Sequence, residues 1–196
     1  MDIKLPDTPQ HHPDCCLSLS KLLLETLNDL LPEAPEYGIS IGSGSGLLEA
    51  LILQHNPAKK IYGVEVSDSV NKYLPQDLVH IVAGTRDLYS AAAEASTWLF
   101  IYPREPQLVA RYVDAFGNGS VKRVVWLGPH ADLADYQPIF SDLTGWREMW
   151  WVAGLGVAPY ETMAVLEREG SESCLLRMGA QQYVRPDQQQ LQALAG

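Results

Sequence analysis

The fold is decided by one glycine-rich stretch, Ile39-Ser40-Ile41-Gly42-Ser43-Gly44-Ser45-Gly46-Leu47-Leu48. The apolar residues before Gly42 are typical of a buried strand, and those after Gly46 begin a helical pattern that extends to Gln54. Glycines between a strand and a helix permit a tight turn and let a ligand approach the bare backbone. The stretch therefore predicts the first strand–loop–helix unit of an α/β fold.

The rest of the chain repeats this alternation of strand and helix. We expect strands over 37–41, 60–66, 78–83, 97–102, 122–127, 147–153 and 161–168, and helices over 17–31, 47–54, 67–73, 87–95, 106–116 and 132–143. The last two strands are joined by a short connection, which favours antiparallel pairing. This order predicts an α/β three-layer sandwich, with a mostly parallel seven-stranded sheet that ends in an antiparallel hairpin.

The chain divides into three parts by composition. Prolines 6, 9 and 13 among polar residues predict an extended arm over residues 1–16, followed by the α/β domain over 17–170. Residues 171–196 contain a glutamine run at 188–190, and we expect a partly ordered tail or a last helix there. A chain of 196 residues has room for one domain of this kind.

Acidic residues outnumber basic ones, 24 against 14, which gives a formal net charge of −10 at pH 7. Phosphate backbones and anionic membrane surfaces are bound by basic patches, so we expect neither nucleic acid nor a membrane as partner. No stretch reaches about 18 consecutive apolar residues, and the start of the chain lacks the pattern of a signal peptide. Three cysteines, two of them adjacent, favour a reduced and cytoplasmic protein.

The arm carries several residues of the types that bind metals, namely His11, His12, Asp14, Cys15 and Cys16. Adjacent ligands seldom converge on one ion, and no second half-site such as C-x-x-C follows. We therefore predict a solvated arm and no metal site.

An acidic residue, Glu65, follows Gly46 by nineteen residues and stands at the end of the second strand. There its carboxylate can accept hydrogen bonds from both ribose hydroxyls of an adenosine-type cofactor. Leu47 occupies the place where G-x-G-x-x-G needs its third glycine, which disfavours a dinucleotide, and no G-K-[ST] of a P-loop follows. The alternative is a glycine turn with an unrelated surface glutamate.

With this loop and this acid, residues 17 to 168 resemble the class I S-adenosylmethionine-dependent methyltransferases. The resemblance rests on Gly42, Gly44, Gly46 and Glu65, and on the two final strands, which match the family's terminal hairpin. It implies a seven-stranded sheet with three helices on each side and S-adenosylmethionine as cofactor. The implied cofactor-binding residues are Gly42, Ser43, Gly44, Gly46, Glu65, Thr85 and Tyr102.

Two positions depart from the family's pattern. The family often has an acidic residue two positions before the first loop glycine, where this chain has Ser40, which cannot hold the methionyl ammonium by charge. After the third strand the family often has an Asp that faces the adenine amino group. Here Thr85 stands in that place, or Asp87 does so in a longer turn. These departures imply a weak cofactor site or none.

Candidate catalytic residues follow the fourth and fifth strands, because ligands of open α/β sheets bind at the carboxyl ends of the strands. His130 belongs to a residue type that accepts protons near neutral pH, which suits removal of a proton from a methyl acceptor. Tyr102 can line the sulfonium region with its ring, and Glu105 can act as a base or pair with a substrate ammonium. A loop histidine, a pocket wall and a solvated helix start are the respective alternatives.

Three functions stay open at this point. The first is an S-adenosylmethionine-dependent methyltransferase acting on a small molecule. Ile101-Tyr102-Pro103-Arg104 lacks the amide and the second proline of the members that methylate nucleobase amines. The second is a non-catalytic methyltransferase-like domain that serves as a binding or scaffold partner. The third, a nucleotide-binding oxidoreductase, is disfavoured by the loop spacing, and the choice between monomer and homodimer is undecided.

Overall fold

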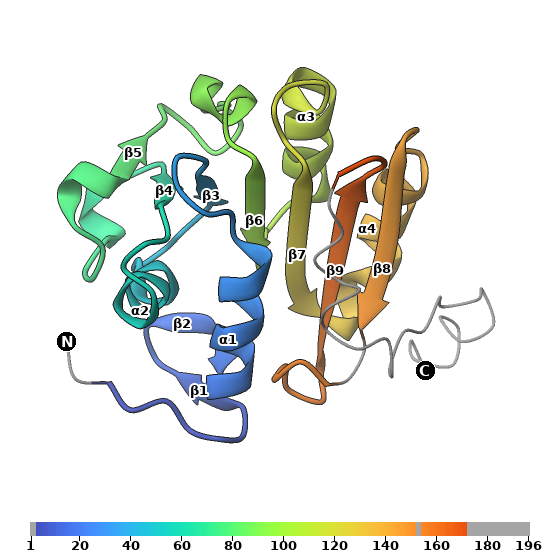
Figure 1. Ribbon diagram of the computed structural model, residues 1–196. Coiled ribbons are helices and arrows are strands. Elements are labelled where there is room, and N and C mark those ends of the chain that lie inside the picture. The colour runs from blue at the N-terminus through green and yellow to red at the C-terminus, as the bar shows by residue number, and fades with distance from the viewer. Residues whose placement is uncertain (1–2, 152–153, 172–196) are drawn as a thin grey trace.

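The computed structural model describes residues 3–151 and 154–171, which form an α/β fold around one seven-stranded sheet (Figure 1). The strands are β3 (Gly38–Ile41), β4 (Ile61–Glu65), β5 (Val79–Ile81), β6 (Thr97–Ile101), β7 (Arg123–Pro129), β8 (Trp146–Trp151) and β9 (Glu161–Arg168). They lie in the order β5-β4-β3-β6-β7-β9-β8. The first five strands in this order pair in parallel, and β9 runs antiparallel to both β7 and β8. The predicted mixed sheet with a terminal hairpin is confirmed.

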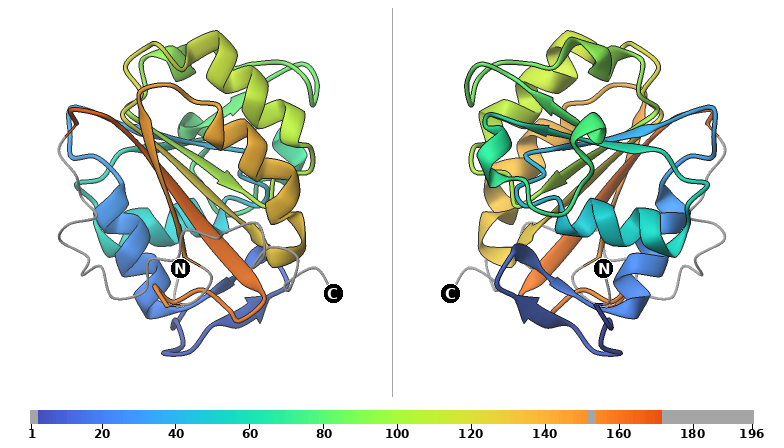
Figure 2. Two further views of the ribbon diagram at one scale, coloured as in Figure 1. Left: turned by 90° about the vertical axis from the view of Figure 1, so that its right-hand side faces the viewer. Right: turned by 90° about the vertical axis from the view of Figure 1, so that its left-hand side faces the viewer.

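Helices cover both faces of this sheet. They are α1 (Lys21–Leu30), α2 (Leu47–His55), α3 (Pro106–Phe116) and α4 (Leu133–Ser141). In β6, Leu99 packs in the cluster that contains α1 and α2, whereas Trp98 and Phe100 pack in the cluster that contains α3 and α4. This division follows from the alternation of side chains along a strand. The two views of Figure 2 show the two helix pairs on opposite sides of the sheet, which gives the three predicted layers.

Two predicted helices are wrong in type. In place of helices over 67–73 and 87–95 the chain forms single 3-10 turns, η1 (Asp68–Val70) and η3 (Ser90–Ala93). After η1 the Asn71 side chain accepts from the backbone N–H of Leu74 and donates to its carbonyl, which closes a turn instead of a helix. In the second segment the carbonyl of Ala91 accepts from Tyr37 Oη and from Glu94 N, so its backbone bond is of the 3-10 type and not the α-helical type.

The other helices differ only in their limits. Two further 3-10 turns, η2 (Gln76–Leu78) and η4 (His130–Asp132), precede β5 and α4. The helix expected over 132–143 begins with η4 and continues as α4, with Pro138 inside it. The structure thus has two α-helices on each side of the sheet within the described residues, where the resemblance implied three.

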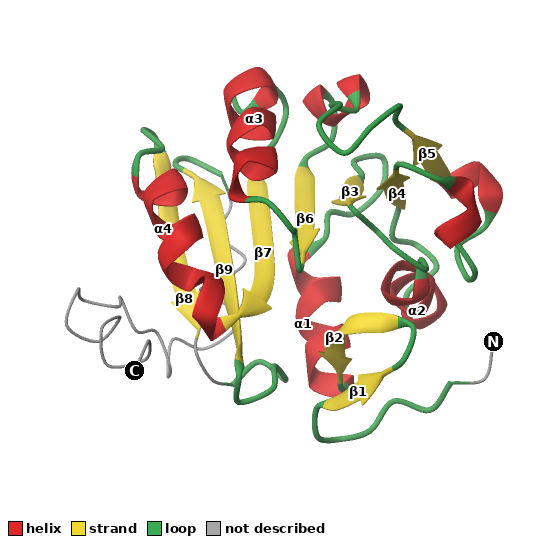
Figure 3. Cartoon of the chain, turned by 180° about the vertical axis from the view of Figure 1, so that it is seen from behind, coloured by secondary structure: helices red, strands yellow, loops and turns green. Residues whose placement is uncertain are grey.

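Residues 10–19 form a β-hairpin where we expected an arm and the start of a helix. Strands β1 (Gln10–His12) and β2 (Cys15–Leu19) pair antiparallel, and Leu17 and Leu19 are buried in the core beneath α1 and α2. Helix α1 therefore begins only at Lys21, after Ser20 has capped it through its hydroxyl. Figure 3 shows the hairpin at the end of the sheet to which the arrowheads of β6 and β7 point.

The division of the chain into arm, domain and tail stays a prediction. All but the first residue of the tail predicted for 171–196 lie outside the described residues. Within the described part, no helix has the length and apolar character needed to cross a bilayer.

Candidate functional site

The glycine loop between β3 and α2 passes through three residues in the left-handed region. Gly42, Gly44 and Gly46 have φ angles of 79°, 58° and 75°, which residues with a Cβ rarely adopt. Gly42 N donates to the carbonyl of Val64 at 2.8 Å, and Gly46 N donates to that of Ser43 at 3.0 Å. The glycines thus fix a bent, hydrogen-bonded backbone at the start of α2, where Gly46 is the N-cap.

These glycines differ in the space around them. A Cβ added to Gly42 or Gly44 would meet nothing within 4 Å, so the loop is open at these two residues. A Cβ on Gly46, or on Gly63 of β4, would lie 2.6 Å or 2.5 Å from a neighbouring side-chain oxygen. Gly46 and Gly63 therefore serve close packing, whereas Gly42 and Gly44 leave backbone accessible to a ligand.

Glu65, at the carboxyl end of β4, has its carboxylate against this loop. Its Oε1 accepts from Gly44 N at 2.5 Å, and its Oε2 accepts from Val66 N at 3.1 Å in a solvent-exposed bond. The structure therefore brings together the acid and the loop that the sequence analysis paired.

A cavity of about 420 Å³ opens beside the loop. Its walls are the loop, the first turn of α2, η1 and the turn of the N-terminal hairpin. Volumes of about 300–1,000 Å³ are usual for small-molecule sites. Of the predicted cofactor-binding residues, Gly42, Ser43 and Gly44 line the cavity.

The other four predicted cofactor-binding residues do not line it. Gly46 ends the loop and donates from its N–H to Ser43, and the Glu65 carboxylate accepts from Gly44 N. Thr85 lies exposed in a turn that is closed by a 2.9 Å bond from Asp87 N to the carbonyl of Gly84. Tyr102 follows β6 directly after the cavity-lining Ile101. The roles of Thr85 and Tyr102 toward a cofactor stay predictions.

Asp14 fastens the hairpin to the loop and to the segment after β4. Its carboxylate accepts from Lys72 Nζ at 2.5 Å and from Tyr73 Oη at 2.6 Å, and its carbonyl accepts from Ser45 Oγ at 2.6 Å. The bonds from Lys72 and Tyr73 hold the pKa of Asp14 below its ordinary value. The arm predicted to be solvated is therefore one wall of the cavity at residues 11 and 13–16.

Tyr102 has a φ angle of 49°, an unusual conformation for a residue with a side chain. Its hydroxyl donates to Glu161 Oε1 at 2.8 Å. Burial, and then the neighbouring Glu161 carboxylate, raise the pKa of Tyr102 far above its ordinary value. The phenol is therefore a neutral hydrogen-bond donor near pH 7 and is poorly suited to accept a proton.

The two other predicted catalytic residues also lie outside the cavity wall. His130 Nε2 lies 2.8 Å from the carbonyl of Pro159, so this nitrogen carries the proton, and Nδ1 accepts from the hydroxyl of Thr162. The two ring nitrogens of His130 thus hold the start of β9 and the segment that precedes it. Glu105 is exposed at the N-cap of α3 and makes no capping bond through its side chain. No observation assigns either residue a catalytic role, and both roles stay predictions.

The sequence analysis missed Glu49, which lines the cavity from the first turn of α2 although the residue is only 1% exposed. Burial raises the pKa of this carboxyl to about 7, and the neighbouring Ser40 hydroxyl opposes the shift without reversing it. A glutamate within the apolar run Leu47-Leu48-Glu49-Ala50-Leu51 was the available signal, because helix faces that pack on a sheet are normally apolar.

Histidine, cysteine and acidic side chains also line this cavity. Within residues 3–151 and 154–171 no group of three or more histidine, cysteine or acidic side chains could hold a metal ion. Cys15 and Cys16 are free thiols, and burial raises the pKa of Cys15 to about 12. The Cys15 thiol is therefore protonated at neutral pH and is a poor nucleophile.

Comparison with known proteins gives matches in structure only. No family model and no curated protein matches the chain. The plantazolicin methyltransferase BpumL in complex with SAH matches with a TM-score of 0.56 and 12% identity, over 75% of this chain and 82% of that chain. A precorrin-6y C5,15-methyltransferase from Geobacter metallireducens GS-15 matches with a TM-score of 0.56 and 10% identity, over 83% and 93%. The methyltransferase domain of bacterial CtHen1 matches with a TM-score of 0.53 and 14% identity, over 74% and 96%.

At 10 to 14% identity these matches speak for the fold. The names of the matched proteins indicate different substrates. The similarity in fold therefore does not indicate the substrate of this chain. Together with the strand order and the glycine loop, the matches show that this chain has the fold of the class I S-adenosylmethionine-dependent methyltransferases.

Proposed function

We propose that the protein is an S-adenosylmethionine-dependent methyltransferase that acts on a small molecule. The observation that carries the proposal is the open backbone of the glycine loop, which borders the cavity at Gly42 and Gly44 and has the Glu65 carboxylate against it. The SAH named in the BpumL structure is the demethylated product of the same cofactor. We also propose a cytoplasmic location, because three cysteines cannot all pair in disulfides.

In this proposal Glu65 and the loop hold the adenosine part of the cofactor. Glu65 Oε2 has its one hydrogen bond on the solvent side, so a ribose hydroxyl can donate to it without displacing the bond from Gly44. When bound, S-adenosylmethionine supplies a sulfonium methyl group that a nucleophile can attack in line. The protein's own task is to orient the acceptor, exclude water and take up a proton where the acceptor carries one.

The acceptor side of the cavity is formed by the hairpin. His11 lines the cavity from β1, and its ring has no hydrogen-bond or ion-pair partner among the described residues. Since both ring nitrogens of His130 are engaged, His11 is the better candidate for proton uptake. The volume of about 420 Å³ and the net charge of −10 favour a small acceptor over a nucleic acid.

Equilibrium binding tests the proposal. Titration calorimetry with S-adenosylmethionine and S-adenosylhomocysteine is expected to give measurable affinity for both, reduced at least tenfold in Glu65→Ala. Glu94→Ala is the matched control, because Glu94 is exposed next to the amino end of β6 and should leave binding unchanged. NADH, titrated in parallel, should give no heat, since the loop spacing disfavours an oxidoreductase.

A non-catalytic binding or scaffold domain is the second candidate. It is favoured by Ser40 and by the two bonds that already hold Glu65 to backbone N–H groups. A folded protein that binds neither S-adenosyl compound would support this second candidate and overturn the first.

A further inference from the structure

Glu49 is a buried acid whose position the fold alone does not explain. It lies in the first turn of α2, three residues after the N-cap Gly46, and the residue is 1% exposed although it lines the cavity. By strict hydrogen-bond geometry neither Glu49 Oε2 nor Ser40 Oγ has a partner among the described residues, although the Ser40 hydroxyl lies close enough to lower the pKa of the carboxyl. A buried polar atom without a partner costs free energy, so its retention calls for a reason.

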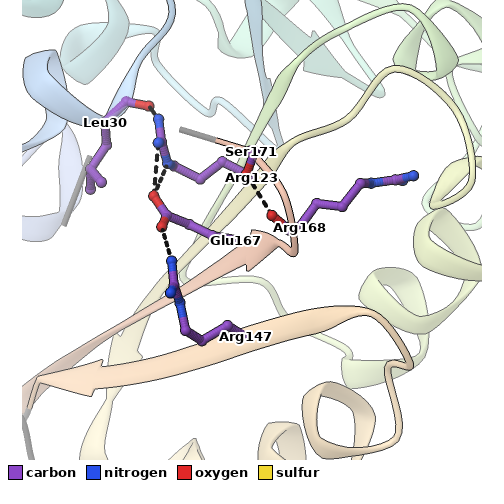
Figure 4. A network of polar contacts seen from close by, with 6 residues as sticks. All are labelled: Leu30, Arg123, Arg147, Glu167, Arg168 and Ser171. Carbon is purple, nitrogen blue, oxygen red and sulfur yellow. Dashed lines mark hydrogen bonds and ion pairs between the residues drawn. The ribbon is translucent and has the colours of Figure 1, made fainter. Parts of the chain in front are cut away.

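In the two other fully buried glutamates of the described chain, both carboxylate oxygens have a partner, whereas Oε2 of Glu49 has none. Glu161 accepts from Ser18 N, Ala158 N and Tyr102 Oη, at 2.9, 3.1 and 2.8 Å. Glu167 lies between two arginines of neighbouring strands, as Figure 4 shows. Glu49 forms no ion pair among the described residues, and it is the one of the three that lines the cavity.

Resting on the proposed function, we propose that the Glu49 carboxylate pairs with the ammonium group of the S-adenosyl ligand, a charge that Ser40 cannot bind. Below about pH 7 the carboxyl without ligand carries its proton, and ligand binding sends that proton to solvent. The positive ammonium then meets a negative carboxylate in a site shielded from water, where the pair is stronger than at the surface.

The surroundings of Glu49 agree with this proton balance. The titratable groups that face it or share its cavity are His11, Asp14, Cys15, Cys16, Glu65 and Lys72. Lys72 is the lysine of this set, and it pairs with Asp14 at 2.5 Å. Glu65 is a second acid, and its charge adds to burial in disfavouring the ionised form of Glu49. A cationic ligand group is therefore the partner that would satisfy the Glu49 carboxylate.

Two ligands and one isosteric variant test the inference. S-adenosylhomocysteine carries the ammonium, whereas 5′-methylthioadenosine has the same adenosine and sulfur but no amino-acid part. Glu49→Gln should weaken S-adenosylhomocysteine at least tenfold and leave 5′-methylthioadenosine within twofold of wild type. Glu94→Gln, at an exposed site, should change neither affinity.

Proton release gives a readout that needs no variant. Calorimetry of the wild type at pH 6 in buffers of different ionisation enthalpy should show close to one proton released per S-adenosylhomocysteine bound and none for 5′-methylthioadenosine. Release should disappear at pH 8.5, where the carboxyl is already ionised. Absence of release at pH 6 would overturn the inference, even if Glu49→Gln failed to fold.

The results separate this inference from the proposed function. If the wild type binds neither ligand, the proposed function is wrong, and so is the inference that rests on it. If the wild type binds both ligands and Glu49→Gln binds S-adenosylhomocysteine with equal affinity, the inference is wrong and the proposed function stands. In the exchange variant Ser40→Asp/Glu49→Ser, recovery of the affinity lost in Glu49→Gln would place the ammonium between these two residues.

Discussion

Two buried acids at opposite ends of the sheet, Glu167 and Glu49, differ in the partners that the fold gives them. At the amino end of β7, Glu167 of β9 is held by Arg123 at 2.8 Å and by Arg147 at 3.1 Å, and Arg123 also donates to the carbonyl of Leu30 (Figure 4). At the carboxyl ends of β3 and β4, Glu49 is as deeply buried and has no such partner among the described residues. The first arrangement ties neighbouring strands together, and the second leaves a carboxyl group that, in our proposal, pairs with the ammonium group of a ligand.

Glu167→Ala should have the largest effect on stability. It leaves Arg123, whose side chain is 12% exposed, without its carboxylate partner, and removing one member of a buried pair costs about 3–5 kcal/mol. Urea denaturation followed by circular dichroism measures the loss. Glu36→Ala is the control, because the ion pair of Glu36 with Lys122 is exposed and worth less than about 1 kcal/mol. Equal losses in the two variants would contradict the inference that burial makes the partners of Glu167 more important than an exposed ion pair.

Glu49→Gln should have the next largest effect on stability, and this effect should favour the variant over wild type increasingly as pH rises. In the folded state the pKa of Glu49 is about 7 against an ordinary 4.5, so between these pH values the unfolded state loses a proton that the folded state keeps. The stability of the wild type therefore falls as pH rises from 4.5 to 7 and is flat above that range. At 1.36 kcal/mol per pKa unit the difference amounts to about 3 kcal/mol.

Thermal or urea unfolding at pH 4.5 and at pH 8 measures this effect. Relative to wild type, Glu49→Gln should be more stable at pH 8 than at pH 4.5, by up to about 3 kcal/mol. Glu161→Gln, in which a fully hydrogen-bonded carboxylate is replaced, should show no such gain at pH 8. A stability difference between Glu49→Gln and wild type that does not change with pH would show that the carboxyl ionises freely in the fold.

Gly44→Ala should cost about 1–2 kcal/mol, because its φ of 58° is strained for a residue with a Cβ. Gly145→Ala is a matched control, since Gly145 has a φ of 79° and no atom within 4 Å of the added Cβ either. The two variants should lose similar stability in urea denaturation. Only Gly44→Ala should also lose affinity for S-adenosylhomocysteine, because Gly44 lines the cavity.

Local patterns in the sequence predicted the sheet better than the site. Strand–helix alternation and the glycine loop depend on neighbouring residues, and β3, α2 and the final hairpin were predicted within two residues. The N-terminal hairpin was missed because Asp14 meets Lys72 and Tyr73 across 58 and 59 positions. Glu49 was missed because its distinguishing feature is a buried carboxylate oxygen without a partner. That feature can be seen only in the packed structure.

Asp14→Asn should have the smallest effect on global stability and a clear local one. Asparagine keeps the shape of Asp14 but loses the charge that faces Lys72, so the hairpin should open more often while the sheet stays intact. Hydrogen exchange of residues 10–19 should become faster than in wild type. Asp7→Asn, which removes an exposed ion pair with Lys21 in the same N-terminal segment, is the control and should leave that exchange unchanged.

The pH dependence of this contact is the opposite of that of Glu49. Because Lys72 and Tyr73 lower the pKa of Asp14 below its ordinary 3.8, its stabilising effect is present above that value and is lost as pH falls through the lower folded pKa. Between pH 5 and 8 the exchange difference between Asp14→Asn and wild type should therefore be constant, whereas the stability difference for Glu49→Gln should change. Exchange in Asp14→Asn that matched wild type would mean that the buried Leu17 and Leu19 alone hold the hairpin over the cavity.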